Sequence, residues 1–175
     1  LVLSTGMATM DEIAHAVGCA RAGGARSIAL LHCVSAYPVP DGSQNLRAVQ
    51  TLRQAFHTEV GLSDHSGDTS GVPIAVALGA SLYERHLMLD GDDGVDGAVS
   101  SSPSGLAAVV ATARWAEAAL GHGRKECLAA EAKNLTASRR ALHARRALKT
   151  GDVVGAGDIV VLRPAIGLPP SLEPE

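Results

Sequence analysis

Four short apolar runs recur along the first ninety residues of this chain, and each gives way to polar residues. The runs end at Ser4, Ser35, Ser63 and Glu84, so successive ends are 31, 28 and 21 residues apart. A strand, its loop and a returning helix need about thirty residues. The spacing therefore predicts a series of consecutive βα units with parallel strands.

Helical segments are expected between these runs. Thr9 and Glu12 have the spacing of a capping box, which predicts a helix that continues to about Ala22, before Gly23-Gly24. Residues 45–56 carry apolar side chains at helical spacing, and so do residues 103–121, which begin with proline. Helices that alternate with strands indicate the α/β class.

The strand ends favour one α/β architecture over another. Four βα units amount to half of a (β/α)8 barrel (TIM barrel), and an open doubly wound sheet is the alternative. Polar residues follow all four runs and are not confined to one switch point. This distribution favours the barrel.

The pattern changes near residue 140. Residues 142–148 predict a strand that leads into a turn, and residues 153–154 and 159–162 predict short β segments. We therefore expect an α/β unit over residues 1–122, a linker over 123–140 and a small, mostly β module over 141–175.

Composition excludes several classes of protein. The formal net charge is −3 and aromatic residues are 2% of the chain, which favours neither a nucleic-acid surface nor binding to an anionic membrane. No apolar run approaches the roughly 20 residues that cross a bilayer, and no signal peptide is visible. Three cysteines without a CxxC pair are typical of reduced thiols, so a cytoplasmic protein is expected.

Two histidines indicate a metal site. His65 and His86 each end or lie in an apolar run, the second of which is expected to be extended from Leu78, and the ends of neighbouring parallel strands meet at one edge of a sheet. Two imidazoles leave positions open for water and substrate oxygens, which suits a hard six-coordinate ion better than structural zinc. Glu84 lies two residues before His86 and is expected on the same face. The alternative is that both histidines only satisfy polar groups of the core, which is the role we expect for His32.

The amino-acid sequence at the strand ends resembles that of the N-acetylneuraminate (sialic acid) synthase family. The resemblance rests on four ordered motifs, Leu-Ser-Thr-Gly-Met (3–7), Leu-His-Cys-Val-Ser-Ala-Tyr-Pro (31–38), Gly-Leu-Ser-Asp-His-Ser (61–66) and Tyr-Glu-Arg-His (83–86). Lys-Thr-Gly-Asp (149–152) and Arg-Pro-Ala-Ile-Gly (163–167) are similar to the start of that family's antifreeze-like (SAF) domain. On this resemblance the chain would be a fragment, with the last four βα units of the barrel and a truncated SAF module.

The resemblance implies a reaction and a set of site residues. Phosphoenolpyruvate would condense with an N-acyl-mannosamine-type aldehyde sugar to give a sialic-type (nonulosonic) acid and phosphate. A Mn²⁺ or Mg²⁺ ion would be bound by the two histidines, and the protein would be a homodimer. The implied roles are catalytic for Glu84 and Asp96, and substrate-binding for Ser4, Ser35, Tyr37, Ser63 and Arg163, with Arg163 reaching the partner subunit's site.

Alternatives stay open for several of these residues. The segment between His86 and Asp96 is one residue shorter than the family pattern, so Asp90, Asp92 and Asp93 compete with Asp96, which is otherwise a solvated loop acid. Strand-end serines also serve as turn or cap residues, and Tyr37 can pack under its loop. For the whole chain, the alternatives are an inactive half-barrel that only binds metal or self-associates, and another metal-dependent barrel aldolase. The choice among sialic, legionaminic, pseudaminic and phosphorylated sugars is open.

Overall fold

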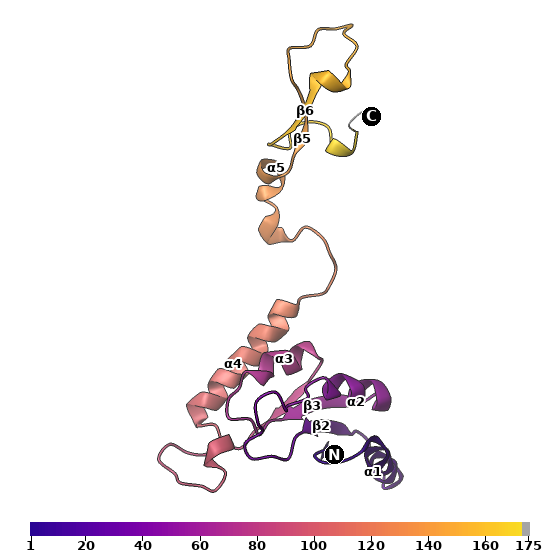
Figure 1. Ribbon diagram of the computed structural model, residues 1–175. Coiled ribbons are helices and arrows are strands. Elements are labelled where there is room, and N and C mark those ends of the chain that lie inside the picture. Colours follow the sequence, from indigo (N-terminus) through magenta and orange to yellow (C-terminus); the bar gives the residue numbers. More distant parts are fainter. Residues whose placement is uncertain (173–175) are drawn as a thin grey trace. The chain divides into compact units, whose positions relative to one another are not determined.

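A four-stranded parallel sheet organises the first part of the chain (Figure 1). The structure is a computed structural model that describes residues 1–172. The strands are β1 (Val2–Ser4), β2 (Ala29–Cys33), β3 (Glu59–Ser63) and β4 (Leu82–Glu84), and they pair in the order β1-β2-β3-β4. The predicted α/β class with parallel strands is confirmed.

The strand register brings the polar strand ends together. Ser63 lies between Cys33 on one side and Glu84 on the other, at the last pair of each ladder. Gly61 permits a close approach within the sheet, because a Cβ atom there would lie 2.5 Å from the Leu82 carbonyl oxygen and 2.7 Å from a Leu31 methyl carbon. Any larger residue would push β4 away from β3 and disturb the strand ends.

Helices follow the strands, as α1 (Met10–Ala22), α2 (Ala48–Phe56), α3 (Gly71–Ala77) and α4 (Pro103–Leu120), with a 3-10 turn η1 at Gly97–Val99. The capping box is confirmed, because the Thr9 hydroxyl accepts from the Glu12 N–H and Glu12 Oε2 accepts from the Thr9 N–H at 2.7 Å. The Ser102 hydroxyl caps α4 in the same way by accepting from the Gly105 N–H. The sequence did not predict α3, which has Pro73 in its first turn and no side-chain cap.

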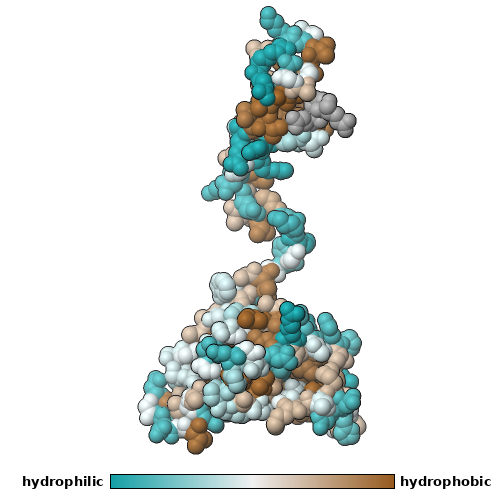
Figure 2. All heavy atoms as spheres, in the orientation of Figure 1, coloured by the Kyte–Doolittle hydropathy of each residue, from teal (hydrophilic) through white to brown (hydrophobic). Residues whose placement is uncertain are grey.

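The core of residues 1–122 lies between the sheet and its helices. Helix α2 packs on β2 and β3. Seven buried apolar side chains from α1, α2, β2, β3 and the residue before β2 form one cluster, namely Ile13, Val17, Ile28, Leu30, Val49, Leu52 and Val60. Burial of each of these side chains contributes roughly 1.5–3 kcal/mol. Figure 2 shows apolar residues scattered among hydrophilic ones on the visible face of this unit.

One strand begins later than the sequence pattern predicts. The fourth apolar run was expected to be extended from Leu78, but the Leu78 N–H bonds to the Ile74 carbonyl oxygen and thereby ends α3. The chain then turns at Gly79, whose φ of 94° suits glycine, and β4 starts only at Leu82. His86 therefore lies two residues beyond β4 and not within it.

Residues 123–175 form a second unit by Cα packing. It contains an antiparallel pair, β5 (Ala141–Ala144) with β6 (Ile159–Leu162), the short helix α5 (Asn134–Ser138) and three 3-10 turns, η2 (Ala129–Glu131), η3 (Ala156–Asp158) and η4 (Pro170–Leu172). The strand predicted over 142–148 ends at Ala144, because its partner β6 starts at Ile159 and the residues before it form η3; the last bond of the pair runs from the Arg145 N–H to the Asp158 carbonyl oxygen. Val153 and Val154 are exposed and form no strand, contrary to the prediction.

No helix within residues 1–172 combines the length and apolar character that a membrane crossing requires.

Candidate functional site

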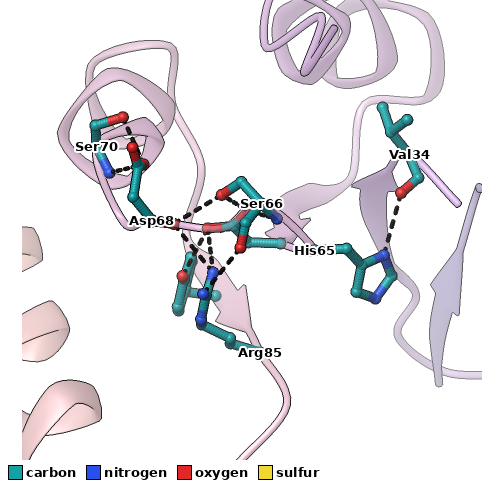
Figure 3. Close-up of polar contacts among 8 residues, drawn as sticks. Val34, His65, Ser66, Asp68, Ser70 and Arg85 are labelled. Atoms are coloured by element: carbon teal, nitrogen blue, oxygen red, sulfur yellow. Dashed lines mark hydrogen bonds and ion pairs between the residues drawn. The ribbon is translucent and has the colours of Figure 1, made fainter. Parts of the chain in front are cut away.

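His65 lies just beyond the end of β3 and is 6% exposed. Its Nδ1–H donates to the Val34 carbonyl oxygen at 3.1 Å, so the ring is turned toward the end of β2 (Figure 3). A hydrogen bond of this kind places the proton on Nδ1 and leaves the Nε2 lone pair for a ligand. The orientation suits a metal-binding imidazole.

His86 completes a pair of imidazoles. Its Nδ1 lies 3.3 Å from Asp96 Oδ2, and its ring centroid is 5.2 Å from that of His65, with an angle of 66° between the ring planes. In both rings Nδ1 therefore lies near an oxygen atom, and Nε2 remains for a ligand. The structure brings together the two residues that the sequence singled out as metal ligands.

Tyr37 stands against both imidazoles. Its ring centroid is 4.2 Å from that of His65 and 5.8 Å from that of His86, and the residue is 54% exposed. The tyrosine is therefore exposed beside both imidazoles and does not pack under its loop.

The two predicted catalytic carboxylates have different surroundings. Glu84 is exposed, and its Oε1 accepts from the buried Ser63 hydroxyl at 2.7 Å. Asp96 is 48% exposed and contacts His86 as described above, so it is more than a solvated loop acid. The Asp96 carboxylate can therefore orient the imidazole, whereas Glu84 contacts Ser63.

The remaining predicted substrate residues are spread more widely. Ser4 ends β1 and Ser35 follows β2, both exposed. Ser35 Oγ lies 3.8 Å from Cys33 Sγ, and Gly6 leaves room for the Ser35 side chain because a Cβ at position 6 would collide with it. Arg163 follows β6 in the second unit and is exposed.

The histidine pair offers two protein ligands and not more. Within the described part of the chain, no three His, Cys, Asp or Glu side chains group around one point that could hold an ion. Glu84 therefore does not join His65 and His86 as a third ligand. His32 is separate, since it is 7% exposed and its Nε2–H donates to the Gln44 carbonyl oxygen at 2.8 Å, as expected for a structural histidine.

Sequence reasoning missed three residues beside the site. Asp64, Tyr83 and Arg85 form a hydrogen-bonded group in which Asp64 Oδ2 accepts from the Tyr83 hydroxyl at 2.8 Å and from Arg85 at 3.2 Å. Burial raises the pKa of the Tyr83 phenol far above its usual value, and the nearby Asp64 charge raises that pKa further. The available signal was positional, because Asp64 and Arg85 each precede one of the two histidines.

Comparisons with known proteins identify relatives of this chain. A family model described as "NeuB family" matches residues 1–125. The N,N'-diacetyllegionaminic acid synthase of Campylobacter jejuni is 38% identical over 174 residues, which cover 96% of this chain and 51% of the relative. A pseudaminic acid synthase of the same species is 34% identical over 175 residues, covering 99% of this chain and 51% of the relative.

A solved structure is similar as well. The N-acetylneuraminic acid (sialic acid) synthetase of Leptospira borgpetersenii matches with a TM-score of 0.68 and 36% identity, covering 76% of this chain and 47% of that one. The chain thus spans about half the length of the proteins it matches. Which half of the barrel it represents stays a prediction.

Proposed function

The chain belongs to the NeuB family, and on that premise we propose that it carries the metal-binding part of a nonulosonic acid synthase. The reaction joins C3 of phosphoenolpyruvate to the aldehyde carbon of an N-acyl-mannosamine-type sugar. The aldehyde oxygen takes up a proton, one water is consumed, and the products are a nine-carbon 2-keto acid and inorganic phosphate. The observation that supports the proposal most directly is the His65–His86 pair, with ring centroids 5.2 Å apart.

The proposed cofactor is a divalent cation. The two imidazoles fit such an ion, because both Nδ1 atoms face oxygen atoms and both Nε2 atoms are left to bind. His65 and His86 would hold Mn²⁺ or Mg²⁺, which supplies Lewis-acid polarisation of the aldehyde oxygen when bound. With only two protein ligands, several coordination positions stay open to water and substrate oxygens.

Side chains around the pair would bind the substrates and move protons. Glu84 is the proposed acid–base group, held by the 2.7 Å bond from Ser63, and Asp96 would keep the His86 ring oriented. Tyr37 would pack against the sugar, since it flanks both imidazoles. Ser4, Ser35 and Ser63 are proposed to face phosphoenolpyruvate through their hydroxyl groups.

The proposed architecture is half of a (β/α)8 barrel followed by an antifreeze-like (SAF) module. Strands β1 and β4 are the ends of the sheet order, so each has an outer edge at which further strands can pair. Activity then depends on the remaining strands of the barrel.

We further propose a homodimer in which Arg163 of one subunit reaches the site of the other, so that Arg163→Ala lowers turnover without loss of metal binding.

Phosphate release from phosphoenolpyruvate tests the proposal. In the full-length protein, release should require both the aldehyde sugar and Mn²⁺ or Mg²⁺, and His86→Ala should lower kcat/KM by at least about a hundredfold. His15→Ala, on the exposed face of α1, is the matched control and should match the wild type. Wild-type turnover by His86→Ala would show that the metal assignment is wrong.

The same assay separates the alternatives. Sugar-dependent consumption of pyruvate in place of phosphoenolpyruvate would indicate a metal-dependent aldolase. Mn²⁺ binding without phosphate release would favour a half-barrel that only binds metal.

A further inference from the structure

A buried ion pair lies directly behind the two histidines. Asp64 precedes His65 and Arg85 precedes His86, and Arg85 Nη1 lies 3.2 Å from Asp64 Oδ2. The side chains of Arg85 and Asp64 are only 3% and 5% exposed. The pair therefore joins the two segments that carry the histidines, on the side opposite the His65 ring.

Arg85 also ties down the backbone of the loop that follows β3. Its Nη2 donates to the Ser66 carbonyl oxygen at 2.9 Å, and its Nη1 donates to the Asp68 carbonyl oxygen at 3.1 Å. Figure 3 shows the guanidinium beside Ser66 and Asp68, whereas the His65 ring points the opposite way, to Val34. One arginine thus fixes the loop on one side and leaves the imidazole free on the other.

Asp64 is fixed just as firmly. Its Oδ1 accepts from the N–H and the hydroxyl of Ser66, and its Oδ2 accepts from the Tyr83 hydroxyl in addition to Arg85. Tyr83 belongs to β4, so the carboxylate joins the β3 loop to the neighbouring strand at two points. Neither histidine segment can shift without breaking several of these bonds.

Stability alone does not account for this group. A buried ion pair loses its hydration, and an apolar pair of similar size often stabilises a fold equally well. Arg85 Nε is moreover buried without a hydrogen-bond partner, a destabilising feature that no other side-chain atom within residues 1–172 shows. What the directional bonds add is geometry, because they fix the relative position of two adjacent segments.

We propose that Asp64 and Arg85 are positioning residues that hold His65 and His86 at the spacing a divalent cation requires. The inference rests on the proposed function, since it presumes that the histidines bind a cation. Groups that support metal ligands from behind typically change metal affinity about 10–100-fold when they are altered. Each histidine ring has one polar partner, Val34 or Asp96, and otherwise contacts Tyr37 and the other ring, so its position also depends on the backbone that this pair holds.

Binding of Mn²⁺ to the full chain, measured by calorimetry or by the electron paramagnetic resonance of free Mn²⁺, tests the inference. Arg85→Lys keeps the charge but replaces the planar guanidinium fork with a single ammonium group. We expect at least about tenfold weaker Mn²⁺ binding with a cooperative unfolding transition retained. Arg114→Lys is the matched control, because Arg114 pairs with Glu117 on the exposed face of α4, and its Mn²⁺ affinity should equal that of the wild type.

The outcomes separate this inference from the proposed function. Wild-type protein that fails to bind Mn²⁺ refutes the metal site, and the inference falls with it. Wild-type binding together with an unchanged affinity in Arg85→Lys refutes the positioning role alone. If Arg85→Lys does not fold, the Mn²⁺ affinity of Tyr83→Phe is measured in its place, because this variant removes one hydrogen bond to Asp64 without leaving a charge unpaired. About threefold weaker Mn²⁺ binding supports the positioning role. An unchanged Mn²⁺ affinity overturns it.

Discussion

In each of the two units an arginine that follows a strand bonds to residues of a loop or turn, but the two arginines have opposite environments. Arg85 in the first unit is 3% exposed and bonds to Asp64 and two backbone carbonyls. Arg146 in the second unit is 50% exposed and bonds to Asp158 at 2.6 Å and Asp152 at 3.1 Å. Between arginine and carboxylate, the exposed contacts are thus shorter than the buried one, which is 3.2 Å.

This contrast shows that distance alone does not rank ion pairs. Water screens the charges around Arg146, and exposed pairs contribute little to stability even with good geometry. Loss of the buried arginine leaves the Asp64 carboxylate without its countercharge in a place that water does not reach. Burial, more than bond length, should decide which substitution lowers the stability of the fold more. Four predictions test that statement.

The largest effect is expected from Arg85→Met. It removes the guanidinium at similar volume and should lower the free energy of unfolding by about 3–5 kcal/mol, because one buried charge is left unpaired. Urea denaturation monitored by circular dichroism measures the change. The double variant Asp64→Asn with Arg85→Met should recover part of the loss, and a single variant as stable as the wild type would contradict the argument.

A smaller effect is expected at an exposed group that bonds to backbone. The Thr9 hydroxyl and Glu12 carboxylate satisfy N–H groups at the start of α1, which have no other partner within the helix. Thr9→Ala should therefore cost about 1 kcal/mol. Thr51→Ala is its control, since Thr51 lies within α2, and urea denaturation that fails to separate the two variants would refute the capping argument.

Acid should loosen the exposed network of the second unit. The Arg146 guanidinium and the Gly155 N–H lower the pKa of Asp158, and the Lys149 N–H and Arg146 lower that of Asp152. A carboxylate with a lowered pKa in the folded state stabilises the fold above its ordinary value of 3.8, and this contribution disappears as the pH falls through the lowered pKa. Amide signals of residues 145–158 should stay constant from pH 7 to 5 and shift only below about pH 4.

The smallest effect is expected from Arg146→Met. Because its partners are solvated, the unfolding midpoint at pH 7 should move by no more than about 2 °C. The variant should also abolish much of the acid response of residues 145–158, which differential scanning calorimetry and amide shifts can follow together. A destabilisation as large as that of Arg85→Met would overturn the ranking by burial.

Much of the fold could be predicted from local sequence patterns. The capping box at Thr9, the amphipathic segment that became α2 and the proline that opens α4 all act within a few residues of chain, and all three predictions are confirmed. Helix α3 lacked such a signal, and the strand expected to begin at Leu78 was delayed because that helix continues to Ala77. Short apolar segments fit a helix and a strand equally well, so packing against α4 decided the outcome.

The site was predictable only in part. His65 and His86 were found because parallel strand ends converge, and the structure places their rings together. The partnership of Asp64 with Arg85 depends on the register between β3 and β4 and on how the loop after β3 folds back, which a single sequence does not specify. Likewise the contact between Asp96 and His86 depends on the path of an irregular segment.

The order of strands in the sheet has a consequence for assembly. Each strand pairs only with the strands that come immediately before and after it in the chain, so every contact of the ladder is available as soon as the next thirty residues or so have left the ribosome. The outer edge of β1 forms one border of the sheet, and each new strand therefore extends the sheet at the other border. The imidazole pair, which belongs to the third and fourth additions, can take shape only once that border has moved past β4.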